Sequence, residues 1–200
     1  MMKLYAIMIY YKTESGVRSF KSAYDVSSFS FFQRGSAKEF MQFTGKILVE
    51  RSALGTRSSV QENEYFLHCL VRENGLAAVS VTDKEYQSRV AMTMMLKVLD
   101  DFAAKVHPLS WTKITKEEEC DYTQLDQFLA TWQNPREADP MTRVQEEIDQ
   151  TKIVMHDTIQ SVLERGEKLD DLVKKSENLS DQSKLFYTQA RKMNKCCNYV

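Results

Sequence analysis

The sequence predicts an α+β fold, with an antiparallel sheet flanked by helices and a long coiled-coil helix after it. Two observations support this prediction. In the first two thirds of the chain, short runs rich in Tyr, Ile, Val and Phe form hairpin-like pairs, each followed by a helical pattern. From residue 140 to 193, apolar residues instead recur at alternating spacings of three and four, with Glu, Asp, Gln, Lys and Arg between them. We therefore expect one globular domain and one extended helix.

The composition excludes several classes of protein. The 200 residues are 42% hydrophobic and include only 6 Gly and 3 Pro, which indicates a folded, non-fibrous chain. The net charge of −1, from 27 basic and 28 acidic residues, provides no field that would recruit nucleic acid, so no nucleic-acid partner is expected. No apolar run approaches the roughly 18 residues that a membrane-spanning helix needs. The 4 cysteines, two of them adjacent, are not typical of a disulfide framework and indicate a reducing compartment.

The predicted domain begins with a hairpin. Residues 3–11 and 17–24 have the composition of strands around a turn at 13–16. The N-terminal apolar run lacks the cleavage site of a signal peptide and is expected to be a buried strand. Phe29, Phe31 and Phe32 are expected to anchor the following loop against the core. Ser36-Ala-Lys-Glu39 then has the pattern of a capping box, which predicts a helix to about residue 51.

This predicted helix has apolar residues on more than one side. Phe43 lies beyond the face that a single sheet would cover. Two interpretations stay open at this point: the helix is sandwiched between the sheet and a loop, or it keeps apolar surface for another partner.

The second half of the domain repeats the strand-and-helix order. Residues 55–61 are polar and rich in Ser, while residues 65–71 and 76–81 are predicted strands around a turn. Residues 82–85 are expected to cap a helix that ends near Val106, before His107 and Pro108. A short helix is expected over residues 125–132. Residues 133–139 then form a linker, and Asp139 followed by Pro140 is a strong signal for the start of the long helix.

No catalytic or metal-binding constellation is predicted. Gly45-Lys46 lacks the upstream glycine of a phosphate-binding loop. His68, His107 and His156 fall in a strand, a loop and the long helix, without ligand spacing between them. We therefore expect neither an enzyme nor a metal or non-covalent cofactor site.

The long helix carries a narrow stripe, called the seam below, that contains one arginine, Arg165. A buried guanidinium needs acceptors from facing helices, which favours a bundle of several helices. From periodicity alone, a homodimeric coiled coil in which Arg165 reaches out to solvent is as good an interpretation. The other seam residues are Met141, Val144, Ile148, Thr151, Met155, Thr158, Val162, Leu169, Leu172, Ser176, Leu179, Ser183, Phe186, Ala190 and Met193.

The strings EEIDQTKIVMHDTI and LERGEKLDDLVKKSENL resemble the motif of the R-SNAREs, the synaptobrevin-like vesicle fusion proteins. In that family a central arginine pairs with three glutamines from partner helices in a four-helix bundle, and Arg165 is the matching residue here. The resemblance implies a SNARE motif that forms a bundle with three Q-SNARE helices on an opposing membrane.

The resemblance extends over the whole chain. KLYAI, AYDVSSFSFFQRGS, QNPREADPM and the Cys-Cys pair near the end are similar to those of the prenylated longin-type R-SNAREs, a group of synaptobrevin homologs. The family implies a profilin-like longin domain with a five-stranded antiparallel sheet over residues 1–132. It also implies a linker at 133–139, a SNARE coiled-coil motif at 140–193 and a lipidated tail at 194–200.

The tail has the spacing of a prenylation signal, because Cys197 lies fourth from the end of the sequence. The last three residues, Asn198-Tyr199-Val200, depart from the usual content of that signal. The resemblance implies a prenyl group on Cys197 and a second lipid, palmitate, on Cys196. One lipid gives reversible membrane binding and two give stable anchoring. The lipid count predicts a membrane pool and a cytosolic pool, and the resemblance implies that the membranes are the cytoplasmic faces of Golgi, ER-Golgi and other transport vesicles.

Together these observations predict an R-SNARE that drives vesicle docking and membrane fusion. The alternative is a longin-containing tether or adaptor whose C-terminal helix only dimerises, which would stack two Arg165 guanidiniums in one layer. Without partners the apolar seam would be exposed. We therefore expect the SNARE motif to fold back over its own longin domain, with Phe43 as an anchor, in an autoinhibited closed state that competes with the bundle.

Overall fold

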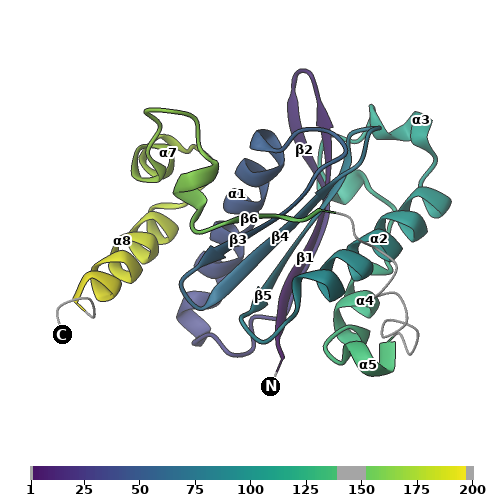
Figure 1. Cartoon of the computed structure of the whole chain (residues 1–200). Helices are drawn as coiled ribbons and strands as arrows, with labels where there is room; N and C mark the ends of the chain where they lie inside the picture. Colours follow the sequence, from purple (N-terminus) through teal and green to yellow (C-terminus); the bar gives the residue numbers. More distant parts are fainter. Residues whose placement is uncertain (1, 139–151, 197–200) are drawn as a thin grey trace.

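A six-stranded sheet lies between two layers of helices (Figure 1). The computed structural model of the chain describes residues 2–138 and 152–196. The strand order is β2-β1-β5-β4-β3-β6. The strands are β1 (Leu4–Thr13), β2 (Gly16–Tyr24), β3 (Arg57–Glu62), β4 (Tyr65–Val71), β5 (Leu76–Asp83) and β6 (Val154–His156). The α+β class and the antiparallel core of the sheet are confirmed.

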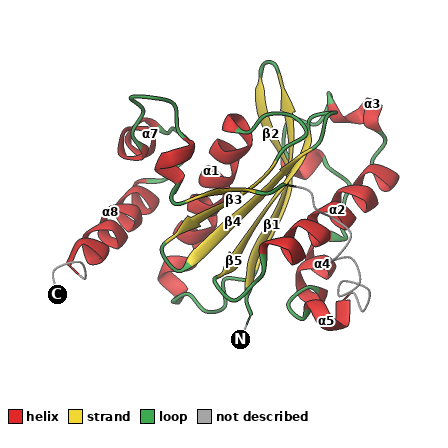
Figure 2. Ribbon diagram, in the orientation of Figure 1, coloured by secondary structure: helices red, strands yellow, loops and turns green. Residues whose placement is uncertain are grey.

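The helices cover both faces of this sheet, as Figure 2 shows by colour. Helix α1 (Arg34–Arg51) packs on one face, and α2 (Ser88–Lys105) lies on the other with the shorter helices α3 (Pro108–Trp111), α4 (Leu125–Thr131) and α5 (Pro135–Ala138). The C-terminal segment contributes α7 (Leu169–Lys175) and α8 (Asp181–Cys196) on the α1 side. Three short 3-10 turns, η1 (Phe31–Gln33), η2 (Glu117–Glu119) and η3 (Ile159–Val162), connect these elements.

The α2 side holds an aromatic core. Phe102 of α2 stacks on Phe20 of β2 at 5.7 Å between ring centroids and meets the edge of Tyr122 at 5.1 Å. Trp111 packs against the same ring at 6.2 Å, and its indole N–H donates to the carbonyl of Val106. Rings at these separations contribute beyond the area that they bury. This cluster therefore fixes α2 and the chain after it on the sheet.

The α1 side depends on a close approach between helix and strand. A Cβ atom added at Gly45 would lie 2.9 Å from the hydroxyl of the buried Tyr10, so any other residue there would displace the Tyr10 side chain. The Tyr10 hydroxyl donates to the carbonyl of Gln42 at 3.1 Å. At the other end of the helix, the Lys12 ammonium donates to the carbonyls of Val49, Glu50 and Ser52 at 3.1, 2.9 and 2.6 Å. Lys12 thus satisfies orphan carbonyls at the C-terminus of α1.

Several predicted boundaries are wrong for identifiable reasons. Helix α1 begins at Arg34, so Ser36 lies buried inside the helix and the expected capping box does not form. Strand β5 continues to Asp83, whose carboxylate accepts from the N–H groups of Glu85 and Tyr86 and forms a turn before α2 begins at Ser88. Residues 82–85 therefore form a turn that Asp83 stabilises, and they do not cap α2 as expected.

The aromatic loop before α1 anchors the core through only one of its three phenylalanines. Phe29 packs against Tyr5 and Tyr65, with ring centroids 5.9 and 6.4 Å apart. Phe31 and Phe32 are 78% and 81% exposed, so the prediction that all three anchor the loop is wrong for these two.

The polar stretch before β4 is a strand. Ser59 of β3 is fully buried, and its hydroxyl lies 2.8 Å from His68 Nδ1, while His68 Nε2 lies 3.0 Å from the hydroxyl of Thr82. Burial lowers the pKa of His68 to about 3, so this imidazole is neutral at physiological pH. His68 is a structural residue of the sheet interior, as the sequence indicates.

The C-terminal segment contains the main departure from the predicted architecture. The sheet has six strands and not five, because β6, from the predicted SNARE motif, pairs in parallel with β3. The described part of this motif is also not one continuous helix in this conformation, since β6, η3, α7 and α8 follow one another. The N-terminal part of the motif lies outside the described residues.

Candidate functional site

The C-terminal segment lies along the outer edge of the sheet and along α1 (Figure 1). Strand β6 pairs with β3 in parallel, with Ser58 opposite Val154 and Val60 opposite His156. Just after β6, Ile159 is 3% exposed, and its N–H donates to Glu62 Oε2 at 3.1 Å. Main-chain pairing and one buried side chain therefore hold the beginning of the segment on the sheet.

Two ion pairs join the next part of the segment to the end of α1. Arg51 Nη2 lies 2.7 Å from Glu167 Oε1, and Arg51 Nη1 lies 3.8 Å from Glu164 Oε1. The Glu164 N–H also donates to the Glu167 carboxylate, and this bond together with Arg51 holds the pKa of Glu167 below its ordinary value. Both acidic residues are thereby held beside the last turn of α1.

Arg165 lies in the turn between these two glutamates. It is exposed, and the next residue, Gly166, has a φ of +92°, a conformation that favours glycine. Arg165 makes no hydrogen bond or ion pair with residues 2–138 or 152–196. No residue in the described part of the chain therefore engages the guanidinium in this conformation.

Helices α7 and α8 bury apolar side chains in the cluster that α1 forms with the sheet. Leu169, Val173 and Leu179 are almost fully buried there. Phe40 of α1 stacks on Tyr187 of α8 at 5.3 Å between ring centroids. Phe43 is half-buried and packs on the edge of the same cluster. Phe40 thus joins α1 to α8, and the ring of Phe43 lies 6.3 Å from that of Phe40 between centroids.

Glu39 of α1 caps the beginning of α8. Its Oε2 accepts from the N–H of Ser180 at 2.9 Å and from the hydroxyl of Ser183 at 2.7 Å. Burial raises the pKa of Glu39, but the bonds from Ser183 and Ser180 outweigh it and leave the pKa below the ordinary value. A carboxylate at this position also complements the positive end of the helix dipole. The interaction joins residues that are far apart in the sequence.

Replacing Glu39 with glutamine should loosen α8 from α1 by about 1–2 kcal/mol, because the charge-assisted bonds and the dipole interaction are lost. Because the pKa of Glu39 is lowered, its contribution is complete above the ordinary value of 4.5 and is lost as the pH falls below it. Hydrogen exchange of the α8 amides measures both effects. Glu50→Gln is the control, since Glu50 lies on the same helix but pairs with Lys46. Equal protection in the two variants would contradict the cap.

The structure brings only part of the predicted seam to the α1 surface. Leu169, Leu179 and Ser183 are buried; Val162, Leu172, Ser176 and Phe186 are half-buried; Met155, Thr158 and Ala190 are exposed. Met193 and Cys196 belong to α8. Met141, Val144, Ile148, Thr151 and Cys197 lie outside the described residues.

Sequence reasoning missed a second set of contact residues. Ile159, Val173 and Tyr187 each follow a seam residue by one position, and all three pack in the α1 cluster. Such positions flank the seam of a coiled coil and are often charged. Apolar residues there were the signal for a second packing surface. Glu39 and Arg51 gave no comparable signal, because helix surfaces commonly carry charges.

The arrangement offers packing surfaces along α1 and the edge of the sheet. Within residues 2–138 and 152–196, no group of three or more His, Cys, Asp or Glu side chains is placed to hold a metal ion. None of the helices in that part of the chain is long and apolar enough to cross a bilayer.

Comparisons with known proteins identify the two parts of the chain. The Synaptobrevin family model matches residues 140–198, and the Longin model, described as a regulated-SNARE-like domain, matches residues 26–129. The chain is 46% identical over 198 residues to the synaptobrevin homolog ykt6 of Schizosaccharomyces pombe, 44% identical over 197 residues to that of Eremothecium gossypii, and 40% identical over 197 residues to that of Saccharomyces cerevisiae. Each alignment covers 98% of both proteins.

The family resemblance noted from the sequence is thereby confirmed at both ends of the chain. The chain belongs to the Ykt6 family of longin-type synaptobrevin homologs, which are R-SNARE proteins of vesicle transport.

Proposed function

We propose that this R-SNARE alternates between the folded-back conformation and a four-helix bundle with three Q-SNARE helices. The observation that carries the proposal is the burial of Leu169, Leu179 and Ser183 against the α1 side of the longin domain. These residues belong to the seam that a bundle would bury. One side chain cannot occupy both sites, so the two states exclude each other and the longin domain acts as an inhibitor.

In the bundle, residues 140–193 form a continuous helix and Arg165 supplies the central polar layer. Its exposure in the folded-back state supports this assignment, because the guanidinium has no competing partner to give up among the described residues. The chain then acts as longin domain (1–132), linker (133–139), SNARE motif and tail (194–200).

The proposal includes membrane attachment through lipids, a prenyl group on Cys197 and palmitate on Cys196. Helix α8 ends at Cys196, so a lipid on the tail would follow directly from the SNARE helix. One lipid gives reversible attachment and two give stable anchoring. Such a protein would divide between the cytosol and the cytoplasmic face of Golgi, ER-Golgi and other vesicle membranes, where zippering draws two bilayers together.

The experiment that tests inhibition is the substitution Phe43→Glu. A carboxylate at this half-buried contact should weaken the folded-back state by about 1–3 kcal/mol, because its desolvation is not compensated there. We expect faster proteolysis and faster hydrogen exchange in residues 154–190, together with faster assembly with Q-SNARE helices.

Phe31→Glu is the matched control, since Phe31 is 78% exposed and outside the α1 cluster. It should leave exchange, proteolysis and assembly unchanged. If residues 154–190 are as well protected from exchange and proteolysis in the Phe43→Glu variant as in the Phe31→Glu variant, Phe43 is an ordinary surface residue. The inhibition model then loses its anchor.

A further inference from the structure

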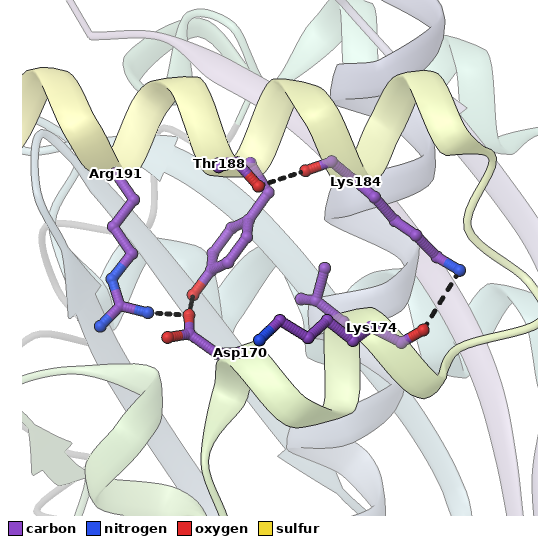
Figure 3. Close-up of a pocket in the computed structure, with 7 residues that line it drawn as sticks. Asp170, Lys174, Lys184, Thr188 and Arg191 are labelled. Atoms are coloured by element: carbon purple, nitrogen blue, oxygen red, sulfur yellow. Dashed lines mark hydrogen bonds and ion pairs between the residues drawn. The ribbon is translucent and has the colours of Figure 1, made fainter.

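A cavity of about 300 Å³ lies between α7 and α8, and none of its lining residues belongs to the seam. Figure 3 shows its charged lining: Lys174 from α7, Lys184 and Arg191 from α8, and Asp170 from α7. The three cations and one carboxylate give this lining a net charge of +2. A concave site with several cations of this kind favours an anion.

The cations of the cavity are only partly satisfied. Asp170 accepts from the Tyr187 hydroxyl at 2.7 Å and forms an ion pair with Arg191. Lys184 Nζ makes one long bond, 3.3 Å, to the carbonyl of Lys174. The Lys174 ammonium makes no hydrogen bond or ion pair with the residues that the structure describes. Two ammonium groups at this site therefore have donors available for a ligand.

The remaining lining suits the organic part of a small ligand. The half-buried ring of Tyr187 provides apolar surface, and the Thr188 hydroxyl lies at the α8 wall, where it donates to the carbonyl of Lys184 at 2.9 Å. A phosphate monoester carries a charge of about −1.5 to −2 at neutral pH and offers three acceptor oxygens, which matches the excess charge and the available donors. A singly charged carboxylate would neutralise only half of the +2 net charge of the lining.

We propose that this cavity binds a small phosphate monoester, with the phosphate between Lys174 and Lys184 and the organic part over the ring of Tyr187. The ester has two sources, a soluble metabolite or the headgroup of a phosphomonoester lipid. Both ligands carry the same phosphate group, so the same residues of the cavity would bind either one.

The site exists only when α7 and α8 fold against each other. Asp170 and Arg191 are paired here, yet in one continuous helix they would be separated by about 30 Å along the axis. A ligand of this cavity therefore binds the folded-back state and not the bundle. At a concentration ten times its Kd, it would shift the equilibrium about elevenfold toward the folded-back state. This coupling rests on the proposed function, whereas binding itself does not.

The test is a titration of the full chain by NMR and calorimetry. The soluble probes are inorganic phosphate and glycerol 3-phosphate, and the lipid probes are phosphatidylcholine vesicles with and without phosphatidic acid. The variant K174Q/K184Q should lower affinity for the phosphate probes by roughly tenfold or more, because two charge-assisted bonds are lost. Lys175→Gln is the matched control, because Lys175 is exposed on α7 and outside the cavity.

Saturable binding of glycerol 3-phosphate that depends on Lys174 and Lys184 would support the site with a soluble ligand. Binding of only the phosphatidic acid vesicles, with the same dependence, would support it with a lipid headgroup. No binding of either class, or equal loss in K174Q/K184Q and K175Q, would overturn the proposal. Binding that leaves the rate of assembly with Q-SNARE helices unchanged would support the site and contradict only its coupling to the proposed inhibition.

Discussion

Replacing Arg165 with glutamate should leave the free chain as stable as before and destabilise its complex with three Q-SNARE helices by roughly 3–5 kcal/mol. In the free chain Arg165 is exposed in a turn, so a substitution there should change the free energy of unfolding by less than about 0.5 kcal/mol. In the bundle the guanidinium would face three glutamine side chains, and a carboxylate cannot supply the donors that their carbonyls need.

Thermal melting of the complex and urea unfolding of the free chain measure these two effects separately. Lys168→Glu is the control, because Lys168 is exposed here and lies outside the seam. The complex of the Arg165→Lys variant should melt at a temperature between those of the wild-type and Arg165→Glu complexes, since an ammonium keeps the charge but offers fewer donors. A complex that melts at the wild-type temperature with Arg165→Glu would remove Arg165 from the central layer.

Replacing Phe102 with alanine should lower the free energy of unfolding by about 3–5 kcal/mol without releasing the C-terminal segment. Phe102 is fully buried in contact with three aromatic rings, so its removal leaves a cavity in the α2 core. From Ile159 onward, the C-terminal segment packs on the opposite face of the sheet, in a separate cluster.

Chemical denaturation measures the loss of stability, and hydrogen exchange of α7 and α8 under native conditions measures docking. Leu109→Ala is the control, because Leu109 is 76% exposed. The expected outcome is weaker global stability with unchanged docking. If Phe102→Ala also exposes α7 and α8 while the domain stays folded, the two faces of the sheet are coupled.

Local patterns predicted most of the longin domain. The end of α2 near Val106 was predictable because His107-Pro108 stops a helix, and β1, β2, β4 and β5 carry enough apolar side chains to be recognised. Strand β3 was missed because its sequence, RSSVQE, has a single apolar residue and its buried serine bonds to His68. That partner lies on the neighbouring strand β4, and the alternation of apolar residues along β3 does not reveal it.

The C-terminal segment could not be predicted from the seam alone. Spacing of three and four describes the helix that a bundle requires, which is a property of the complex and not of the free chain. The folded-back state depends on residues one position beyond the seam, such as Val173, and on partners in α1 such as Glu39. The predicted capping box at Ser36 and Glu39 illustrates the same limit, since Glu39 caps a helix more than a hundred residues away.

The pairing of β6 with β3 has a consequence for the opened protein. When β6 leaves, the main chain of Ser58, Ser59 and Val60 becomes an unpaired sheet edge. Exposed edges template strand addition between molecules, and proteins restrain this with short edge strands and charged side chains. Strand β3 is six residues long and has Arg57 and Glu62 at its ends. The polarity that concealed this strand in the sequence would thus limit self-association on a crowded membrane while the SNARE motif is engaged elsewhere.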